Sequence, residues 1–175
     1  QAVEAIEDMH FSGGKLLLCG NGGSAADCEH ISGELLKGFL LARPEKIKGF
    51  EKLQGGIAAI PLPSLSALIS AFSNDVAPEL VYAQLTNAIA RENDILFCIS
   101  TSGNSKNVVL AARLAKEKNI KTVALTGKNG GELKEICDIC ICAPETETFK
   151  VQELHLPIYH AICAQCEEDI FGGKQ

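Results

Sequence analysis

Apolar residues in this chain occur as short continuous runs separated by longer stretches in which they recur every three or four positions. Leu16 to Cys19 is one such run, and Ile95 to Ile99 is another. Runs of this kind are typical of strands that are buried on both faces. The spacing of Val108, Ala111 and Ala115 is instead typical of a helix with one buried side. The pattern therefore predicts strands that alternate with helices.

The predicted elements cover most of the chain. The expected strands are 15–19, 57–60, 94–99, 121–125 and 137–142, and the expected helices are 1–12, 24–37, 64–72, 78–92, 106–118, a short one within 127–137, and 150–171. This alternation predicts an α/β fold in which a five-stranded parallel sheet forms the middle of a three-layer α-β-α sandwich, as in flavodoxin-like or Rossmann-like folds. We expect Pro61 and Pro63 to end the second strand, 38–56 to form an excursion or lid, and Asn74 and Asp75 to lie in a loop.

Length and charge narrow the class of protein. The 175 residues, 46% of them apolar, suit a single domain spanning 1–175. The chain starts without Met inside a predicted helix, so we expect that helix to be incomplete. A net charge of −6 without any basic run argues against nucleic-acid and membrane-surface partners. Because no apolar stretch reaches the roughly 18–20 residues of a membrane helix, we expect a cytoplasmic protein.

Eight cysteines are many for this length. The pairs Cys137-x-x-Cys140 and Cys163-x-x-Cys166 have a spacing found in zinc sites, and a four-cysteine zinc site is one interpretation. We favour the interpretation that these cysteines are small core side chains. Residues 136–143 alternate like a strand, while the second pair lies one helical turn apart in another element. We therefore expect core cysteines in a reducing compartment.

A glycine-rich turn follows the first predicted strand. Gly20, Gly22 and Gly23 leave backbone N–H groups open to a ligand, and Ser24 stands where the cap of the next helix is expected. Such a turn at a helix N-terminus predicts an anion or a polar sugar group as ligand. Gly20-x-Gly22-x-x-Ala25 also satisfies the dinucleotide fingerprint, but no acidic residue ends the second predicted strand. We expect no nucleotide cofactor.

A second turn, rich in hydroxyl groups, follows the third predicted strand. Ser100, Thr101, Ser102 and Ser105 stand at a junction between strand and helix, where hydroxyl and backbone donors can converge on a phosphate. Serine also caps helices without a ligand, which accounts for Ser105 but not for the other three. The turn therefore favours phosphate binding.

Two predicted helices carry candidate metal-binding or acid-base residues. His30 and Glu34 are four residues apart and share a helix face, an arrangement that suits a metal ion, an acid-base pair or an ordinary ion pair. On the last predicted helix, Gln152 and His160 are eight residues apart and so about 80° apart around the axis. Spacing alone pairs Gln152 with His155.

Four ordered motifs resemble one known family. CGNGGSAADCEH at 19–30, STSGNS at 100–105, ALTGKNGG at 124–131 and VQELHLPIYH at 151–160 resemble the sugar isomerase (SIS) domain family, and within it the isomerases of heptose phosphates. The resemblance covers nearly the whole chain. It implies the SIS fold, a sugar-phosphate substrate, one zinc ion per subunit, and a homotetramer with sites at subunit interfaces.

The resemblance also implies roles for individual residues. It places Glu34 and His160 at catalytic positions and selects His160 over His155. Of these two we expect Glu34 to be the base and His160 its partner acid. It implies substrate contacts and zinc ligands as follows: Asn21, Gly22, Gly23 and Gln152 contact substrate, Asn74 and Asp75 meet sugar hydroxyls, Ser100, Thr101, Ser102 and Ser105 hold phosphate, and His30, Glu34, Gln152 and His160 hold zinc.

The function implied is that of an aldose-ketose isomerase, converting sedoheptulose 7-phosphate to D-glycero-D-manno-heptose 7-phosphate through an enediol or enediolate. The alternative is a non-catalytic SIS protein of the DnaA initiator-associating type, which senses sugar phosphates or binds a partner. That type replaces the equivalents of Glu34 and His160, and this chain retains both. One departure from the heptose isomerases concerns their motif E-[LF]-x-G-R-[YF]. The corresponding residues here, Glu34 to Phe39, lack the Arg.

Overall fold

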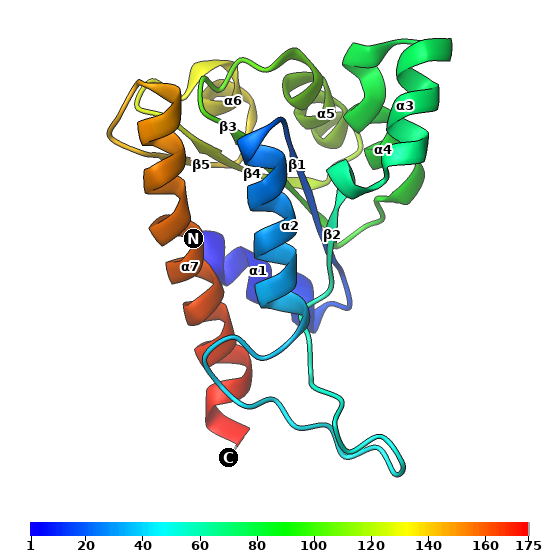
Figure 1. Cartoon of the computed structure of the whole chain (residues 1–175), viewed down its shortest axis with the longest axis vertical. Helices are drawn as coiled ribbons and strands as arrows, with labels where there is room; N and C mark the ends of the chain where they lie inside the picture. Colours follow the sequence, from blue (N-terminus) through cyan, green and yellow to red (C-terminus); the bar gives the residue numbers. More distant parts are fainter. Residues whose placement is uncertain (175) are drawn as a thin grey trace.

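The computed structural model describes residues 1–174 (Figure 1). Within them, a five-stranded parallel sheet has the order β2-β1-β3-β4-β5. The strands are β1 Leu16–Gly20, β2 Ala59–Pro61, β3 Ile95–Ser100, β4 Lys121–Thr126 and β5 Ile139–Cys142. The helices are α1 Ala2–Phe11, α2 Gly23–Leu36, α3 Ser66–Asp75, α4 Val81–Ile89, α5 Lys106–Glu117, α6 Gly131–Ile136 and α7 Thr148–Phe171, with 3-10 turns at Leu62–Ser64, Pro78–Leu80 and Gly172–Lys174.

Successive side chains along each strand pack alternately into two separate hydrophobic cores. Leu16 and Leu18 of β1 join the core beneath α1, α2 and α7, whereas Leu17 and Cys19 join the core beneath α4, α5 and α6. Fully burying a leucine side chain contributes about 1.5–3 kcal/mol, so a strand that is apolar at every position is stable only with helices on both faces. The three-layer α-β-α sandwich predicted from the sequence is confirmed.

The order of the strands creates a crevice between β1 and β3. After β1 the chain crosses to β2 on one side, and after β3 it continues to β4 and β5 on the other. The two turns that carry the predicted ligand contacts, 20–23 and 100–105, leave these neighbouring strands, which pair up to Gly20 and Ile99. Ligands of open parallel sheets bind at such a switch point, beyond the carboxyl ends of the strands.

Several local predictions need correction. Asn74 and Asp75 are the last residues of α3 rather than loop residues, because the helix continues until Val76 leaves helical geometry. The second strand does end at Pro61 as predicted, with Pro61 as its last residue, which an edge strand tolerates because one row of its N–H groups needs no partner. The N-cap of α2 is Gly22, with φ of 55°, and Ser24 lies buried inside the helix.

The excursion predicted at 38–56 is confirmed. It contains neither a helix nor a named strand, only an isolated bridge between Pro44 and Gln54. In Figure 1 this segment (cyan) lies at the bottom of the molecule, whereas α2 begins near the top. Its start is fastened to α7, since the Glu167 carboxylate accepts hydrogen bonds from the backbone N–H groups of Phe39, Leu40 and Leu41.

The two cysteine pairs lie on opposite faces of the sheet. Cys163 and Cys166 are buried in the core beneath α1, α2 and α7, while Cys137 and Cys140 pack against the other core. They cannot share a zinc ion, and all eight cysteines are free thiols. The interpretation of these residues as small core side chains is confirmed. Among residues 1–174, no helix combines the length and the apolarity needed to cross a membrane.

Candidate functional site

Two helices bring three candidate side chains together. His30 and Glu34 lie on α2, His160 lies on α7, and the two helices pack against each other. The Nε2 atom of His30 is 3.2 Å from Oε1 of Glu34 and 3.4 Å from Nε2 of His160. Their ligand atoms all lie within 4.8 Å of one another. We call these three residues the His-Glu-His cluster.

The surroundings of the His-Glu-His cluster leave one side open to solvent. The Glu34 side chain is 16% exposed and that of His30 is 43% exposed. The Phe39 ring lies 5.5 Å from the His160 ring, and the Lys37 ammonium is 3.5 Å from Oε2 of Glu34. Two imidazole nitrogens and a carboxylate oxygen are the donor types that zinc prefers, so the residues present fit such an ion.

Gln152 and His155 occupy different surroundings on α7. The Gln152 amide lies against Gly23, so a Cβ atom there would fit only if the Gln152 side chain moved away. His155 is fully buried, and its Nε2 atom is 3.2 Å from the carbonyl oxygen of Thr126. The structure therefore brings His160, and not His155, to His30, while Gln152 stands beside the glycine turn. Spacing along one helix was a poor guide because the partner residues belong to other elements.

The hydroxyl-rich turn is compact and gathers its polar groups before α5. The hydroxyls of Ser100 and Ser105 are 3.0 Å apart, and the Ser102 hydroxyl accepts a hydrogen bond of 3.1 Å from the backbone N–H of Asn104. Ser105 occupies the N-cap position without capping through its side chain. Gly103 has φ of 68° and packs on the backbone of Gly130, so a side chain would not fit. Hydroxyl groups and the positive end of α5 thus coincide, as the predicted phosphate site requires.

A pair of amide side chains links the two turns. The side chains of Asn21 and Asn107 exchange two hydrogen bonds of 2.9 Å each, one in each direction. Asn21 belongs to the glycine turn, and Asn107 is the second residue of α5. Sequence reasoning missed Asn107, whose only signal is its place directly after the hydroxyl-rich turn. The link holds both candidate ligand-binding turns in one crevice.

Asn74 and Asp75 stand apart from the other predicted site residues. Both are exposed, and the Asn74 amide donates a hydrogen bond of 2.8 Å to the Asp75 carboxylate. Among the described residues, no hydrogen bond joins either side chain to the His-Glu-His cluster or to the two turns. They lie at the end of α3, a helix with no buried residue.

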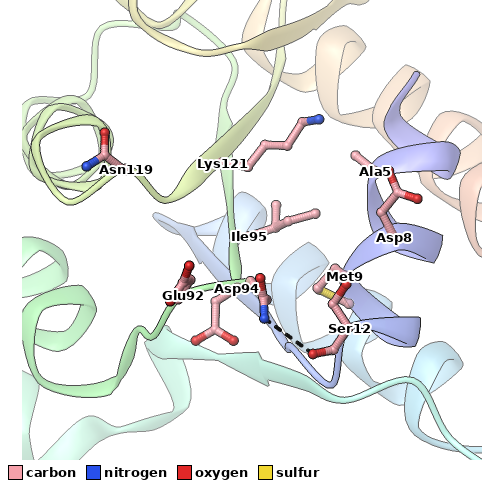
Figure 2. Close-up of a pocket in the computed structure, with 10 residues that line it drawn as sticks. Ala5, Asp8, Met9, Ser12, Glu92, Asp94, Ile95, Asn119 and Lys121 are labelled. Atoms are coloured by element: carbon pink, nitrogen blue, oxygen red, sulfur yellow. Dashed lines mark hydrogen bonds between the residues drawn. The ribbon is translucent and has the colours of Figure 1, made fainter.

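A shallow pocket of about 320 Å³ lies at the opposite edge of the sheet. Figure 2 shows its lining, which includes Asp8, Ser12 and Glu92 together with Ile95 and Lys121, the first residues of β3 and β4. This is the amino edge of a parallel sheet, where ligands of such folds do not bind. The pocket is therefore separate from the candidate site.

Comparison with known proteins agrees with this geometry. The SIS domain family matches residues 1–127, more than half of the chain. The chain belongs to the SIS domain family. A curated SIS relative, the phosphoheptose isomerase of Akkermansia muciniphila, is 38% identical over 99% of this chain and 86% of its own length. The phosphoheptose isomerase of Aneurinibacillus thermoaerophilus is 41% identical over 99% of this chain and 81% of its own.

A solved SIS structure extends the likeness to three dimensions. The phosphoheptose isomerase of Francisella tularensis superposes with a TM-score of 0.83 at 32% identity, covering 95% of this chain and 83% of that one. The coverage includes far more than the 1–127 match. It therefore reaches into α7, the helix that supplies Gln152 and His160.

Proposed function

We propose that this SIS protein is an aldose-ketose isomerase that interconverts sedoheptulose 7-phosphate and D-glycero-D-manno-heptose 7-phosphate. The observation that carries the proposal is the His-Glu-His cluster, in which His160 of α7 meets two residues of α2, the helix that begins at the glycine turn. The relatives named phosphoheptose isomerase support the choice of substrate. The reaction moves hydrogen within one molecule, so no redox cofactor is needed.

The distance along α2 suits a long sugar phosphate. The rise from Gly23 to His30 is roughly 10 Å, a length comparable with that of an extended seven-carbon sugar phosphate. We infer that the phosphate binds Ser100, Thr101, Ser102 and Ser105 at the start of α5. Asn21, Gly22, Gly23 and Gln152 would then contact the sugar chain on its way to the cluster.

Glu34 is the proposed base. Its carboxylate takes a proton from C1 of the ketose, and the electron pair forms the C1–C2 double bond while negative charge develops on O2. His160 carries a proton between the two oxygens, and Glu34 returns its proton to C2 to give the aldose. A positioned acid or base is typically worth about 10²–10⁴ in rate.

Zinc is the proposed metal of the cluster. His30, Glu34 and His160 would hold it, with Gln152 as the fourth ligand implied by the family. Bound there, it would supply a Lewis acid for the carbonyl oxygen and the developing enediolate.

We also propose a homotetramer located in the cytoplasm. The apolar side chains on and beside α3 are exposed in the single chain, which supports burial against other copies. A neighbouring copy would also bring Asn74 and Asp75 to a site with which, among the described residues of one chain, their side chains make no hydrogen bond. Eight free thiols support a reducing compartment.

The test is an assay of the purified chain with sedoheptulose 7-phosphate and a panel of shorter ketose phosphates, with zinc measured on the same sample. We expect turnover of the seven-carbon ketose in preference to the others, with one zinc ion per subunit. Binding of sugar phosphates without turnover would instead indicate a non-catalytic sensor and would refute the proposal.

A further inference from the structure

A chain of polar side chains runs behind the His-Glu-His cluster, in the interface between α2 and α7. The hydroxyl of Tyr159 lies 2.9 Å from Nδ1 of His30, the ring nitrogen that faces away from the cluster. Tyr159 itself is only 1% exposed. The two nitrogens of His30 are thus divided, since Nε2 faces Glu34 and His160 whereas Nδ1 faces a buried hydroxyl.

Asp27 stands next in the chain. It lies one helical turn before His30 on α2, and its Oδ2 atom is buried without a hydrogen-bond partner among the described residues. Burial raises the pKa of Asp27, while the charge of His155 and a hydrogen bond from the Tyr159 hydroxyl act in the opposite direction. The hydroxyl of Tyr159 is therefore positioned between Asp27 and His30.

His155 is the last of these polar side chains. Its Nε2–H donates to the carbonyl oxygen of Thr126, and its Nδ1 atom is buried without a partner among residues 1–174. Burying polar groups between two helices costs free energy that apolar side chains would not cost. Such a group of residues, directly behind the cluster, points to a role in holding it.

We propose that Tyr159, supported by Asp27, is a positioning residue that fixes the His30 ring with Nε2 toward Glu34 and His160, and so sets the affinity of the cluster for a divalent metal ion. The inference rests on the proposed function of the cluster. With a metal on Nε2, Nδ1–H donates to the Tyr159 oxygen, and the Tyr159 O–H donates to the Asp27 carboxylate. Each hydrogen bond then has one donor and one acceptor. A flip of the ring would break the bond from Nδ1–H to Tyr159, and the other tautomer would draw the Tyr159 proton away from Asp27.

The decisive variant is Tyr159→Phe, which removes the hydroxyl and keeps the buried ring. Outer partners of metal-bound histidines typically contribute about 10- to 100-fold to metal affinity. We expect a zinc Kd weakened by that factor, measured on the full chain by competition with a chromophoric chelator. The matched control is Tyr82→Phe, which removes another buried tyrosine hydroxyl, bonded to the carbonyl oxygen of Gly20 at 2.5 Å, and leaves the zinc Kd unchanged.

A second measurement does not depend on metal or turnover. In metal-free protein labelled with ¹⁵N at histidine, we expect His30 to hold one tautomer in the wild type and both tautomers in Tyr159→Phe. His30→Ala identifies the resonance. If Tyr159→Phe has the zinc Kd and the His30 spectrum of the wild type, Tyr159 does not position His30 and the inference is wrong. If the wild type binds no zinc, the zinc part of the proposed function fails, while the tautomer measurement still decides the role of Tyr159.

Discussion

Arg43 and Glu167 form an ion pair of 2.7 Å in which both side chains are fully buried. Arg43 also donates hydrogen bonds of 2.8 Å and 3.3 Å to the carbonyl oxygens of Leu35 and Glu34, in the last turn of α2. The pair therefore ties the 38–56 segment to α7 and closes the end of the helix that carries the proposed base. A single buried interaction thus supports both the fold and the site.

Removing one charge of this pair is expected to destabilise the protein strongly. Glu167→Gln leaves the Arg43 charge buried without a counter-charge, which typically costs about 3–5 kcal/mol. The matched control is Glu132→Gln, because the pair of Arg113 and Glu132 has the same 2.7 Å separation but side chains that are 60% and 52% exposed. Exposed pairs contribute about 0–1 kcal/mol. Urea unfolding that gives equal losses for the two variants would show that burial of the pair does not matter.

The same carboxylate predicts a loss of stability in acid. Burial alone would raise the pKa of Glu167, but the N–H groups of Phe39 and Leu40 and the Arg43 guanidinium outweigh it, so the pKa is lowered. A carboxyl group whose pKa is lowered by folding stabilises the folded protein at pH values above its pKa in the unfolded chain, about 4.3. This stability is lost as the pH falls through the pKa of the folded state. The difference in unfolding free energy between wild type and Glu167→Gln is expected to shrink below that pH. A difference that stays constant down to acid unfolding would contradict the assignment.

The hydroxyl-rich turn predicts a specific loss of affinity. Ser102→Ala removes one proposed phosphate donor, and a hydrogen bond to a charged group contributes about 1.5–3 kcal/mol. We expect sugar-phosphate binding, measured by calorimetry, to weaken by at least tenfold. Ser12→Ala, at the amino edge of the sheet, is the control and leaves affinity unchanged. A co-crystal with the phosphate on Lys or Arg side chains of 38–56 would overturn the assignment.

The exposed apolar face around α3 predicts the assembly. Leu65, Leu68, Val76 and Leu80 are 37–66% exposed in the single chain. Leu68→Glu places a charge in the proposed interface, and we expect light scattering to report a smaller species than the tetramer of the wild type. Glu117→Lys, an exposed change on α5, serves as the control. A wild type that is monomeric and fully active at micromolar concentration would refute the tetramer.

Sequence reasoning was reliable where one residue's surroundings are set by its own strand or helix. The apolar run at Leu16 predicted β1 because a strand covered on both faces has no polar side. The spacing of His30 and Glu34 placed them on one face of α2. These patterns depend on local geometry alone.

It failed where contacts join distant parts of the chain. Asn21 and Asn107 are 86 residues apart, and Tyr159 and His30 are 129 residues apart. Periodicity reports which side of a helix a residue occupies but not which element packs there. Nothing in the sequence distinguished Tyr159 from an ordinary core aromatic residue, and the polar end of α3 at Asn74 had the composition of a loop.

The most direct test of the account is the rate of conversion of sedoheptulose 7-phosphate by wild type and Glu34→Gln, followed by NMR in D₂O. The account predicts conversion by the wild type, with deuterium at C2 of the aldose in those turnovers in which the proton held by Glu34 exchanges with solvent before transfer. It predicts a rate lower by about 10²–10⁴ with the variant, because the amide cannot accept the C1 proton. Glu29→Gln, an exposed change on the same helix, controls for the loss of a surface charge. A Glu34→Gln protein that converts the sugar at the wild-type rate would contradict the central claim that Glu34 is the base.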